Sequence, residues 1–151
     1  KFVYVDETGL DIYFYRKYGR ALIGKAVYGI ERGKKFERVS ILAAQNGHKI
    51  IEPLEYSGIM DAELFEFWIE KCLMPQLSDG AVIILDNAPF HRKKQLKEMA
   101  EKHGKQIIFL PPYSPELKPI EHFWNWLKRK ISECIHKCKN LDEAIDNAFK
   151  V

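Results

Sequence analysis

Three acidic residues stand where the sequence could present carboxylates from rigid elements. Asp6 follows the apolar run 2–5 and Asp86 follows the apolar run 81–85, so each is expected where a strand ends. Glu121 lies in the proline-punctuated segment 110–124 and is expected in the first turn of a helix. Carboxylates held close together repel unless a cation lies between them, and Mg²⁺ and Mn²⁺ favour such hard oxygen ligands. The pattern predicts a divalent-metal site for phosphoryl transfer.

Two metal ions about 3.5–4 Å apart can hold both the attacking and the leaving oxygen of a displacement at phosphorus. Either Asp6 or Asp86 could bridge them, with Glu121 completing the ligand set from the opposite side. Each acid also has a structural alternative. An Asp at a strand end often forms a turn, and a Glu in a first helical turn often only complements the helix dipole. Their joint context favours metal binding.

The helix expected from Pro119 gives Glu121 a defined position. Proline suits a first helical turn, and an acid there is favoured in its ionised form by the helix dipole. At about 100° per residue, Glu121 falls at the edge of the apolar stripe, and Asn125, Lys128 and Ser132 continue along the same shoulder. This shoulder is interpreted as a polar track on which Lys128 holds a DNA phosphate.

Other candidates for DNA contact lie near the acids in the sequence. Asn87 could orient a ligand or cap the next helix, and His91 could contact a phosphate or shuttle a proton. Arg92 and Lys93 open a basic helix that suits phosphate contacts, although a charge run is usually only a solvated face. Tyr113 could stack on an unpaired base, but packing is the commoner role of such a residue.

Composition sets broad limits. The chain has 151 residues, 46% of them hydrophobic, and a net charge of +3, which suits one domain and permits a nucleic-acid partner. Three cysteines argue against a disulfide framework and for a reducing compartment. Cys134, His136 and Cys138 suggest zinc, but on one continuing helix the histidine would point away from both thiols. No zinc site is expected.

The hydrophobic pattern predicts an α/β fold, in which a mixed central sheet has helices on both faces. Strands are expected at 2–5, 39–44, 50–56, 81–85 and 106–110, with further glycine-broken strands between 12 and 44. The turn-prone pair Asn46-Gly47 is expected to join 39–44 and 50–56 as a hairpin. Helices are expected after Asp61 as N-cap, around 96–103, from Pro119, and at 141–149 after Asn140 as N-cap. One domain spanning residues 1–151 is expected. Because Lys1 leads directly into a strand, the sequence looks like a piece of a longer protein.

Three segments resemble the catalytic domain of mariner-like DDE transposases and their bacterial insertion-sequence relatives: Asp6-Glu7-Thr8, residues 85–91 (LDNAPFH) and residues 112–121 (PYSPELKPIE). Thirty-four residues separate Asp86 from Glu121, the spacing of that branch. The resemblance implies an RNase H-like fold with Asp6, Asp86 and Glu121 as catalytic residues and ligands of two Mg²⁺ or Mn²⁺ ions. It implies cleavage of DNA at transposon ends, transfer of the new 3′-OH to target DNA, and a homodimer in the full-length protein.

Two departures from the family pattern are visible. Lys118 stands where the family usually has asparagine, which is interpreted as a mild change outside the ligand set. The N-terminal helix-turn-helix region that recognises transposon ends is absent from this chain, so weak DNA binding with little sequence preference is expected. An RNase H-like nuclease that only hydrolyses, or a domesticated inactive module for DNA binding or assembly, remain alternatives. The expected location is the cytoplasm, on the nucleoid, for a bacterial protein and the nucleus for a eukaryotic one.

Overall fold

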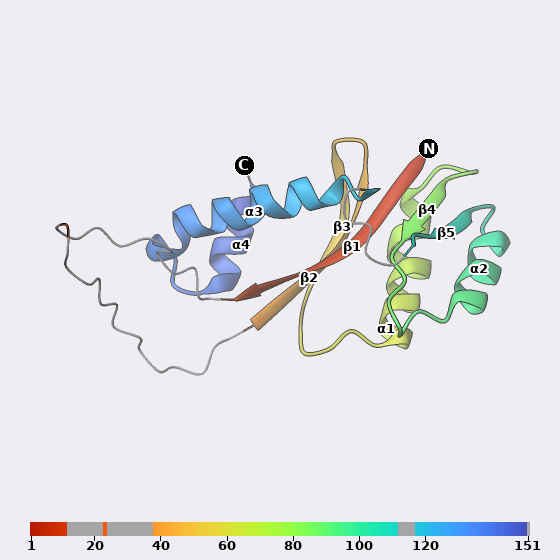
Figure 1. Cartoon of the computed structure of the whole chain (residues 1–151), viewed down its shortest axis with the longest axis horizontal. Coiled ribbons are helices and arrows are strands. Elements are labelled where there is room, and N and C mark those ends of the chain that lie inside the picture. Colours follow the sequence, from red (N-terminus) through yellow and green to blue (C-terminus); the bar gives the residue numbers. More distant parts are fainter. Residues whose placement is uncertain (12–22, 24–37, 112–116, 151) are drawn as a thin grey trace.

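Five strands form one mixed sheet with the order β3-β2-β1-β4-β5 (Figure 1). The computed structural model describes residues 1–11, 23, 38–111 and 117–150; Tyr113 and the strands expected between 12 and 37 lie outside them. The strands are β1 (Phe2–Asp11), β2 (Arg38–Asn46), β3 (Lys49–Ser57), β4 (Val82–Leu85) and β5 (Gln106–Phe109). Pairing is antiparallel for β1–β2 and β2–β3 and parallel for β1–β4 and β4–β5, which confirms the predicted mixed sheet.

The hairpin β2–β3 turns where the sequence predicts it. Asn46 pairs with Lys49, and Gly47 between them has a φ of +63°, a left-handed conformation that glycine adopts without strain. The hairpin carries a register irregularity between Leu42 and Ala44. Its strands place apolar side chains on both faces of the sheet, so the hairpin contributes to two separate cores.

One face of the sheet is covered by α1 (Ala62–Phe67), which continues as the π-helical turn η1 (Trp68–Leu73) and the 3₁₀ turn η2 (Met74–Gln76), and by α2 (Lys93–Lys102). The predicted N-cap of α1 is confirmed, since Asp61 Oδ1 accepts a hydrogen bond from the Leu64 backbone N–H at 2.8 Å. Trp68 and Ile69 are among the buried residues that pack these helices onto Val3 and Val5 of β1.

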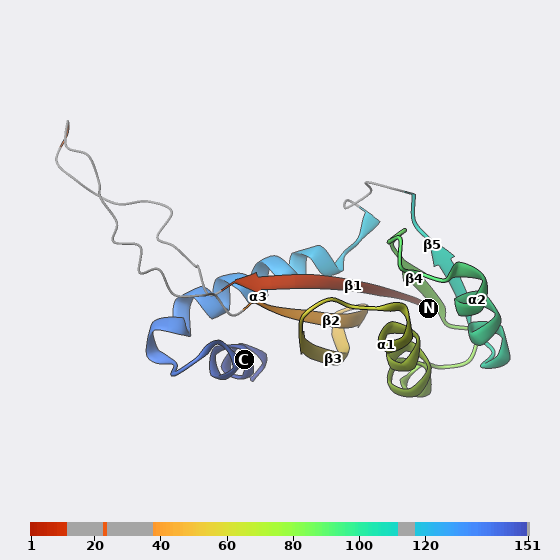
Figure 2. The same ribbon diagram turned by 90° about the horizontal axis from the view of Figure 1, so that it is seen from below.

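The opposite face is covered by α3 (Ile120–Cys134), followed by the 3₁₀ turn η4 (Ile135–Lys137) and by α4 (Leu141–Phe149). The residues of α3 that face the sheet recur at helical spacing and are fully buried: Ile120, Trp124, Leu127 and Ile131. Asn140 caps α4 as predicted, because its Oδ1 accepts from the Glu143 N–H at 2.9 Å. Figure 2 shows α3 and α1 on opposite sides of β1.

The long strand β1 connects the two halves of the molecule (Figure 1). Its N-terminal part pairs with β4 and packs Val3 and Val5 into the core under α1 and α2, whereas Leu10 belongs to the core under α3 and α4. Asp6 lies between these two parts. None of the helices among the described residues is long and apolar enough to cross a membrane.

Candidate active site

Asp6 on β1 and Asp86 just after β4 lie at the same level of two neighbouring parallel strands. The parallel ladder between β1 and β4 ends with the pair Tyr4 and Ile84, and each aspartate comes two residues after its member of that pair. Asp86 directly follows β4, as the sequence predicts. The register of the two strands therefore brings these acids together from positions 80 residues apart.

The prediction that Asp6 ends its strand is wrong. β1 continues to Asp11, because β2 pairs with it in the antiparallel direction from Tyr4 to Asp11. Asp6 therefore belongs to the middle of a ten-residue strand and lies opposite Ala43 of β2. Only the β4 side of β1 loses its partner near Asp6, so the carboxylate is held by a strand that is still paired on its other edge.

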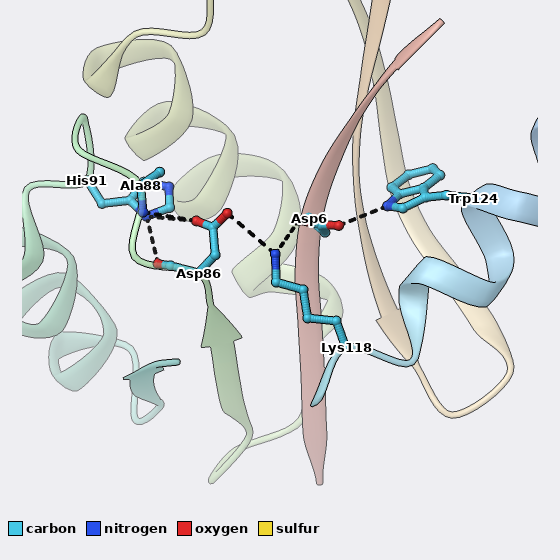
Figure 3. A network of polar contacts seen from close by, with 6 residues as sticks. All are labelled: Asp6, Asp86, Ala88, His91, Lys118 and Trp124. Atoms are coloured by element: carbon cyan, nitrogen blue, oxygen red, sulfur yellow. Dashed lines mark hydrogen bonds and ion pairs between the residues drawn. The ribbon is translucent and has the colours of Figure 1, made fainter. Parts of the chain in front are cut away.

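An ammonium group joins the two aspartates. Lys118 Nζ lies 2.8 Å from Asp6 Oδ1 and 3.4 Å from Asp86 Oδ2, as Figure 3 shows. The side chains of Asp6 and Lys118 are only 8% and 14% exposed, whereas that of Asp86 is 42% exposed. Lys118 is interpreted from the sequence as a mild change outside the ligand set; the structure adds that its charged group contacts two of the three predicted ligands, Asp6 and Asp86.

These carboxylates also determine the charge of Lys118. Burial alone would lower the pKa of Lys118, but the hydrogen bond and the charge of Asp6, with the charge of Asp86, outweigh burial and raise the pKa above its ordinary value. The side chain is therefore an ammonium at neutral pH. The two carboxylates and the ammonium form an ion cluster with two negative charges and one positive charge. The cluster is buried at Asp6 and Lys118 and open to solvent at Asp86.

The second oxygen of Asp6 is held from α3. The buried indole of Trp124 donates from Nε1 to Asp6 Oδ2 at 3.1 Å (Figure 3). The helical pattern of the sequence marks Trp124 only as a core residue. A buried indole N–H usually finds a hydrogen-bond acceptor, and that general rule is the signal in the sequence that could have identified this contact.

Asp86 is held by the loop that follows it. Its Oδ1 accepts a hydrogen bond from the Ala88 backbone N–H at 3.2 Å, and His91 Nδ1 lies 3.2 Å from the Asp86 carbonyl oxygen and 3.6 Å from Oδ1. The His91 ring stacks on Phe65 with 4.5 Å between ring centroids, and its side chain is 4% exposed. Burial lowers the pKa of His91, against the opposing effect of Asp86, so the ring is neutral at pH 7.

The residues that were predicted to contact DNA differ in their exposure and in their partners within the protein. The His91 side chain lies against Asp86 and is 4% exposed, and Arg92 forms a two-bond ion pair with Glu66 at 2.7 Å for each bond. Lys93 lies 5.5 Å from the centroid of the Phe109 ring and is exposed. His91 and Arg92 thus have partners within the protein, and their roles as DNA contacts stay predictions.

Asn87 is exposed and does not cap the next helix, whose N-cap position is Arg92. Lys128 is half-buried on α3, one residue after the buried Leu127, and keeps the shoulder position that the helical angles predict. Both residues keep their predicted roles as candidate DNA contacts.

Glu121 lies in the first turn of α3, as predicted, and is half-buried. Its backbone N–H donates to the Lys118 carbonyl oxygen at 3.1 Å, so the two residues share one turn. Among residues 1–11, 23, 38–111 and 117–150, no three His, Cys, Asp or Glu side chains are gathered closely enough to hold a metal ion. Glu121 is thus not joined to Asp6 and Asp86 in this arrangement, and its role as a third ligand stays a prediction.

The donor set of Asp6 and Asp86 fits a divalent cation. Two carboxylates supply hard oxygen ligands from neighbouring strands, and the Lys118 ammonium shows that one cation can contact both of them. The same two acids line a small pocket together with Glu7 and His91. Lys118 and Trp124 are the site residues whose contacts the sequence did not reveal.

Comparisons with known proteins place these features in a family. The sequence profile described as DDE superfamily endonuclease matches residues 1–145. An uncharacterized protein, y4pE/y4sA, from Sinorhizobium fredii is 34% identical over 87 residues, which cover 50% of this chain and 62% of that protein. The Tcb2 transposase of a transposable element of Caenorhabditis briggsae is 30% identical over 86 residues, 54% of this chain and 32% of that protein.

Solved structures show the same fold. The Mos1 strand transfer complex matches with a TM-score of 0.68 at 16% identity and covers 99% of this chain and 51% of the Mos1 chain. The catalytic core domain of BIV integrase matches with a TM-score of 0.58 at 14% identity, covering 97% of this chain and 79% of that chain. The fold is therefore RNase H-like, as these catalytic cores are. The chain spans less than two thirds of the length of the curated relatives that it matches.

Proposed function

The chain belongs to the DDE superfamily of endonucleases, and we propose that it is the catalytic domain of a transposase. In this proposal the full-length protein cleaves DNA at the ends of a transposon and joins the new 3′-OH to target DNA. The named relatives support this choice, since one is a transposable-element transposase and one neighbouring fold is that of a strand transfer complex.

The single observation that carries the proposal is that Asp6 and Asp86 lie close together and contact the same cation. Two acids that are 80 residues apart in sequence lie at one level of the sheet and share one cation, the Lys118 ammonium. Ion pairs of purely structural use rarely need a second carboxylate at the same point, because like charges repel there. A site that concentrates negative charge on a partly open edge suits divalent metal ions.

We infer that Asp6, Asp86 and Glu121 would hold Mg²⁺ or Mn²⁺, two ions in all. When bound, such ions supply an activated hydroxyl for attack and stabilise the charge that develops on the leaving oxygen. The protein's own residues orient the ligands: Trp124 holds one oxygen of Asp6, and the Ala88 N–H holds one oxygen of Asp86. Helix α3 carries Glu121 at its N-terminal end, where the helix dipole favours the carboxylate.

DNA is the proposed partner, as transposon ends and as target. The exposed Lys93 and Asn87 near Asp86, and Lys128 along α3, are the residues of the described part that we assign to phosphate contacts. Such contacts are independent of sequence, so recognition of the transposon end would require another part of the full-length protein. A homodimer that brings two ends together, working on the nucleoid or in the nucleus, completes the proposal.

Strand-transfer assays test this function directly. The full-length protein is given Mg²⁺, labelled transposon ends that are either intact or already cleaved, and a plasmid target. We expect nicking and joining, and a loss of both by at least about 100-fold in Asp86→Asn. The control is Asp79→Asn, whose carboxylate is fully exposed and 3.9 Å from Lys105; it should keep full activity.

The results separate the alternatives. Unchanged Mg²⁺-dependent nicking by Asp86→Asn would overturn the assignment of the metal site. Nicking of intact ends without joining of cleaved ends would favour a nuclease that only hydrolyses. Binding of DNA without either reaction would favour an inactive binding or assembly module.

A further inference from the structure

The side chain of Lys118 occupies the position between the two aspartates that a bound cation would take. It reaches this position from the segment just before α3, and Nζ lies 2.8 Å from Asp6 Oδ1 and 3.4 Å from Asp86 Oδ2 (Figure 3). With 14% of its side chain exposed, Lys118 is held against the carboxylates and not in solvent. Its contacts use oxygen atoms that a divalent ion at this site would also need.

An ammonium and a divalent ion cannot both hold this position. Mg²⁺ binds oxygen ligands at roughly 2.0–2.1 Å, so an ion held by Asp6 and Asp86 would lie within a few ångström of Nζ. Two like charges at that separation repel, and the repulsion is stronger where protein replaces water. Asp6 is 8% exposed, so solvent screens this point poorly. Binding of the ion therefore requires Lys118 to withdraw.

We propose that Lys118 is a built-in competitor of the divalent ion, which fills the gap between Asp6 and Asp86 until the ion displaces it. This inference rests on the proposed function and adds a residue that sets how much metal the site requires. Lysine suits the role because its charge is compact and its four-carbon stem is flexible, so the ammonium can move to solvent without a change of backbone.

The competition has a second consequence, for stability. Without Lys118, the mostly buried Asp6 carboxylate would face Asp86 without this cation between them; among the bonds of the described residues it would keep the one from Trp124. A chain that lacks the ammonium should therefore be less stable before metal binds. It should also gain more stability from metal than the parent chain, because no protein cation has to be displaced.

The main comparison of the test uses three variants of the chain without DNA. Lys118→Asn removes the ammonium, and Lys118→Arg keeps a positive charge at the same position. The control is Lys130→Asn, which removes a lysine that pairs with Glu133 at 3.2 Å on the surface of α3. Free Mn²⁺ is measured by its paramagnetic resonance signal during titration, and thermal unfolding is followed with and without Mn²⁺.

We expect Lys118→Asn to bind Mn²⁺ about tenfold more tightly than the parent chain, and Lys118→Arg and Lys130→Asn to bind it as weakly as the parent. Without metal, Lys118→Asn should unfold roughly 2–4 °C below Lys130→Asn, and saturating Mn²⁺ should reverse that order. Lys118→Gln makes the same comparison if the asparagine variant does not fold.

Mn²⁺ binding by Asp6→Asn distinguishes an error about Lys118 from an error about the metal site itself. If Lys118→Asn and Lys118→Gln bind Mn²⁺ no more tightly than the parent while Asp6→Asn weakens binding, competition by Lys118 is wrong and the metal site stands. If Asp6→Asn changes Mn²⁺ binding neither in the parent nor in the Lys118→Asn background, the metal site itself is wrong and the inference fails with it.

Discussion

Trp124 holds Asp6 in a fixed orientation. The indole Nε1 donates to Asp6 Oδ2 at 3.1 Å, although the two residues lie 118 positions apart in the sequence. The other oxygen of the same carboxylate faces Lys118, so each oxygen of Asp6 has its own donor. The bond ties α3 to the middle of β1 and couples the helix that carries Glu121 to the first aspartate.

Replacing Trp124 with phenylalanine should therefore affect both stability and metal binding. Trp124→Phe keeps an aromatic ring in the core but leaves one oxygen of a mostly buried carboxylate without its donor, which should lower the free energy of unfolding by about 1–3 kcal/mol. Loss of an orienting partner should weaken Mn²⁺ binding about tenfold. Urea unfolding and Mn²⁺ titration measure the two effects.

The control for that change is Trp126→Phe on the same helix. Trp126 is half-buried and stacks on Phe123 with 5.7 Å between ring centroids. The Trp126→Phe variant should lose less unfolding free energy than Trp124→Phe and should keep the Mn²⁺ affinity of the parent. Equal effects of the two substitutions would mean that packing, and not the bond to Asp6, explains the role of Trp124.

The ion pair between Arg92 and Glu66 should make Arg92 a stability residue more than a DNA contact. Both bonds of the pair are 2.7 Å long, and the Arg92 side chain is partly exposed. Arg92→Ala should cost about 0.5–1 kcal/mol of unfolding free energy, with non-additive effects in a double variant with Glu66→Ala. In fluorescence anisotropy with duplex DNA, Lys93→Ala should weaken binding more than Arg92→Ala. The reverse order would restore Arg92 as a phosphate contact.

DNA binding by this chain should depend strongly on salt. Contacts to phosphates release counterions, so the affinity falls as the salt concentration rises. Each lost contact should reduce the magnitude of this negative slope, log affinity against log salt, by about one. Lys128→Ala should show this change and weaken binding to unrelated duplexes equally. Lys102→Ala, in the last turn of α2, is the control and should leave the slope unchanged. A footprint confined to one sequence would contradict the prediction.

Glu55 should make stability fall as the pH rises through neutrality. Partial burial, the hydrogen bond and charge of Asp142 and the charge of Asp146 together raise the pKa of Glu55 to about 7. The folded chain keeps this proton up to a higher pH than the unfolded chain does. The stability that the proton contributes is therefore complete below about pH 4.5 and is lost as the pH rises through about 7.

Glu55→Gln should remove that loss. Because Glu55 is only partly buried and the residue as a whole is exposed, solvent screens part of these effects, and the variant should be more stable than the parent by about 0.5–1 kcal/mol at pH 8. The difference should disappear near pH 5, where Glu55 carries its proton in the folded chain. Urea unfolding at both pH values measures this, with the exposed Glu101→Gln as control. A benefit that is equal at pH 5 and pH 8 would exclude the titration of Glu55 as its cause.

Local signals in the sequence predicted the elements well. Asp61 and Asn140 cap the helices that they were expected to begin, and the turn at Gly47 joins the expected hairpin. These features depend on residues close in sequence, which is why pattern and propensity suffice for them. The order of the sheet and its mixed pairing agree with the family that the motifs around Asp86 indicate.

The parts that the sequence did not predict depend on distant partners. β1 extends past Asp6 because β2 pairs with it, and a four-residue apolar run does not reveal that pairing. The contacts of Lys118 form only when the chain just before α3 comes close to both β1 and the end of β4. The sequence around Lys118 fits a lysine exposed on the surface equally well. The approach of its ammonium group to both aspartates could therefore not be predicted from the sequence.

The division of β1 between two cores has a consequence for folding. Val3 and Val5 pack under α1 and α2, while Leu10 packs under α3 and α4, and Asp6 lies between them. The bonds from Lys118 and Trp124 to Asp6 close loops of 112 and 118 positions, the kind of non-local contact that forms late. Trp124 lies in the core under α3 and α4, whereas β4, which leads to Asp86, packs its Ile83 and Leu85 into the other core. A chain with only the first of these cores formed would lack Asp86 beside Asp6, and a chain with only the second would lack the bond from Trp124. The proposed activity would therefore require both cores to be formed.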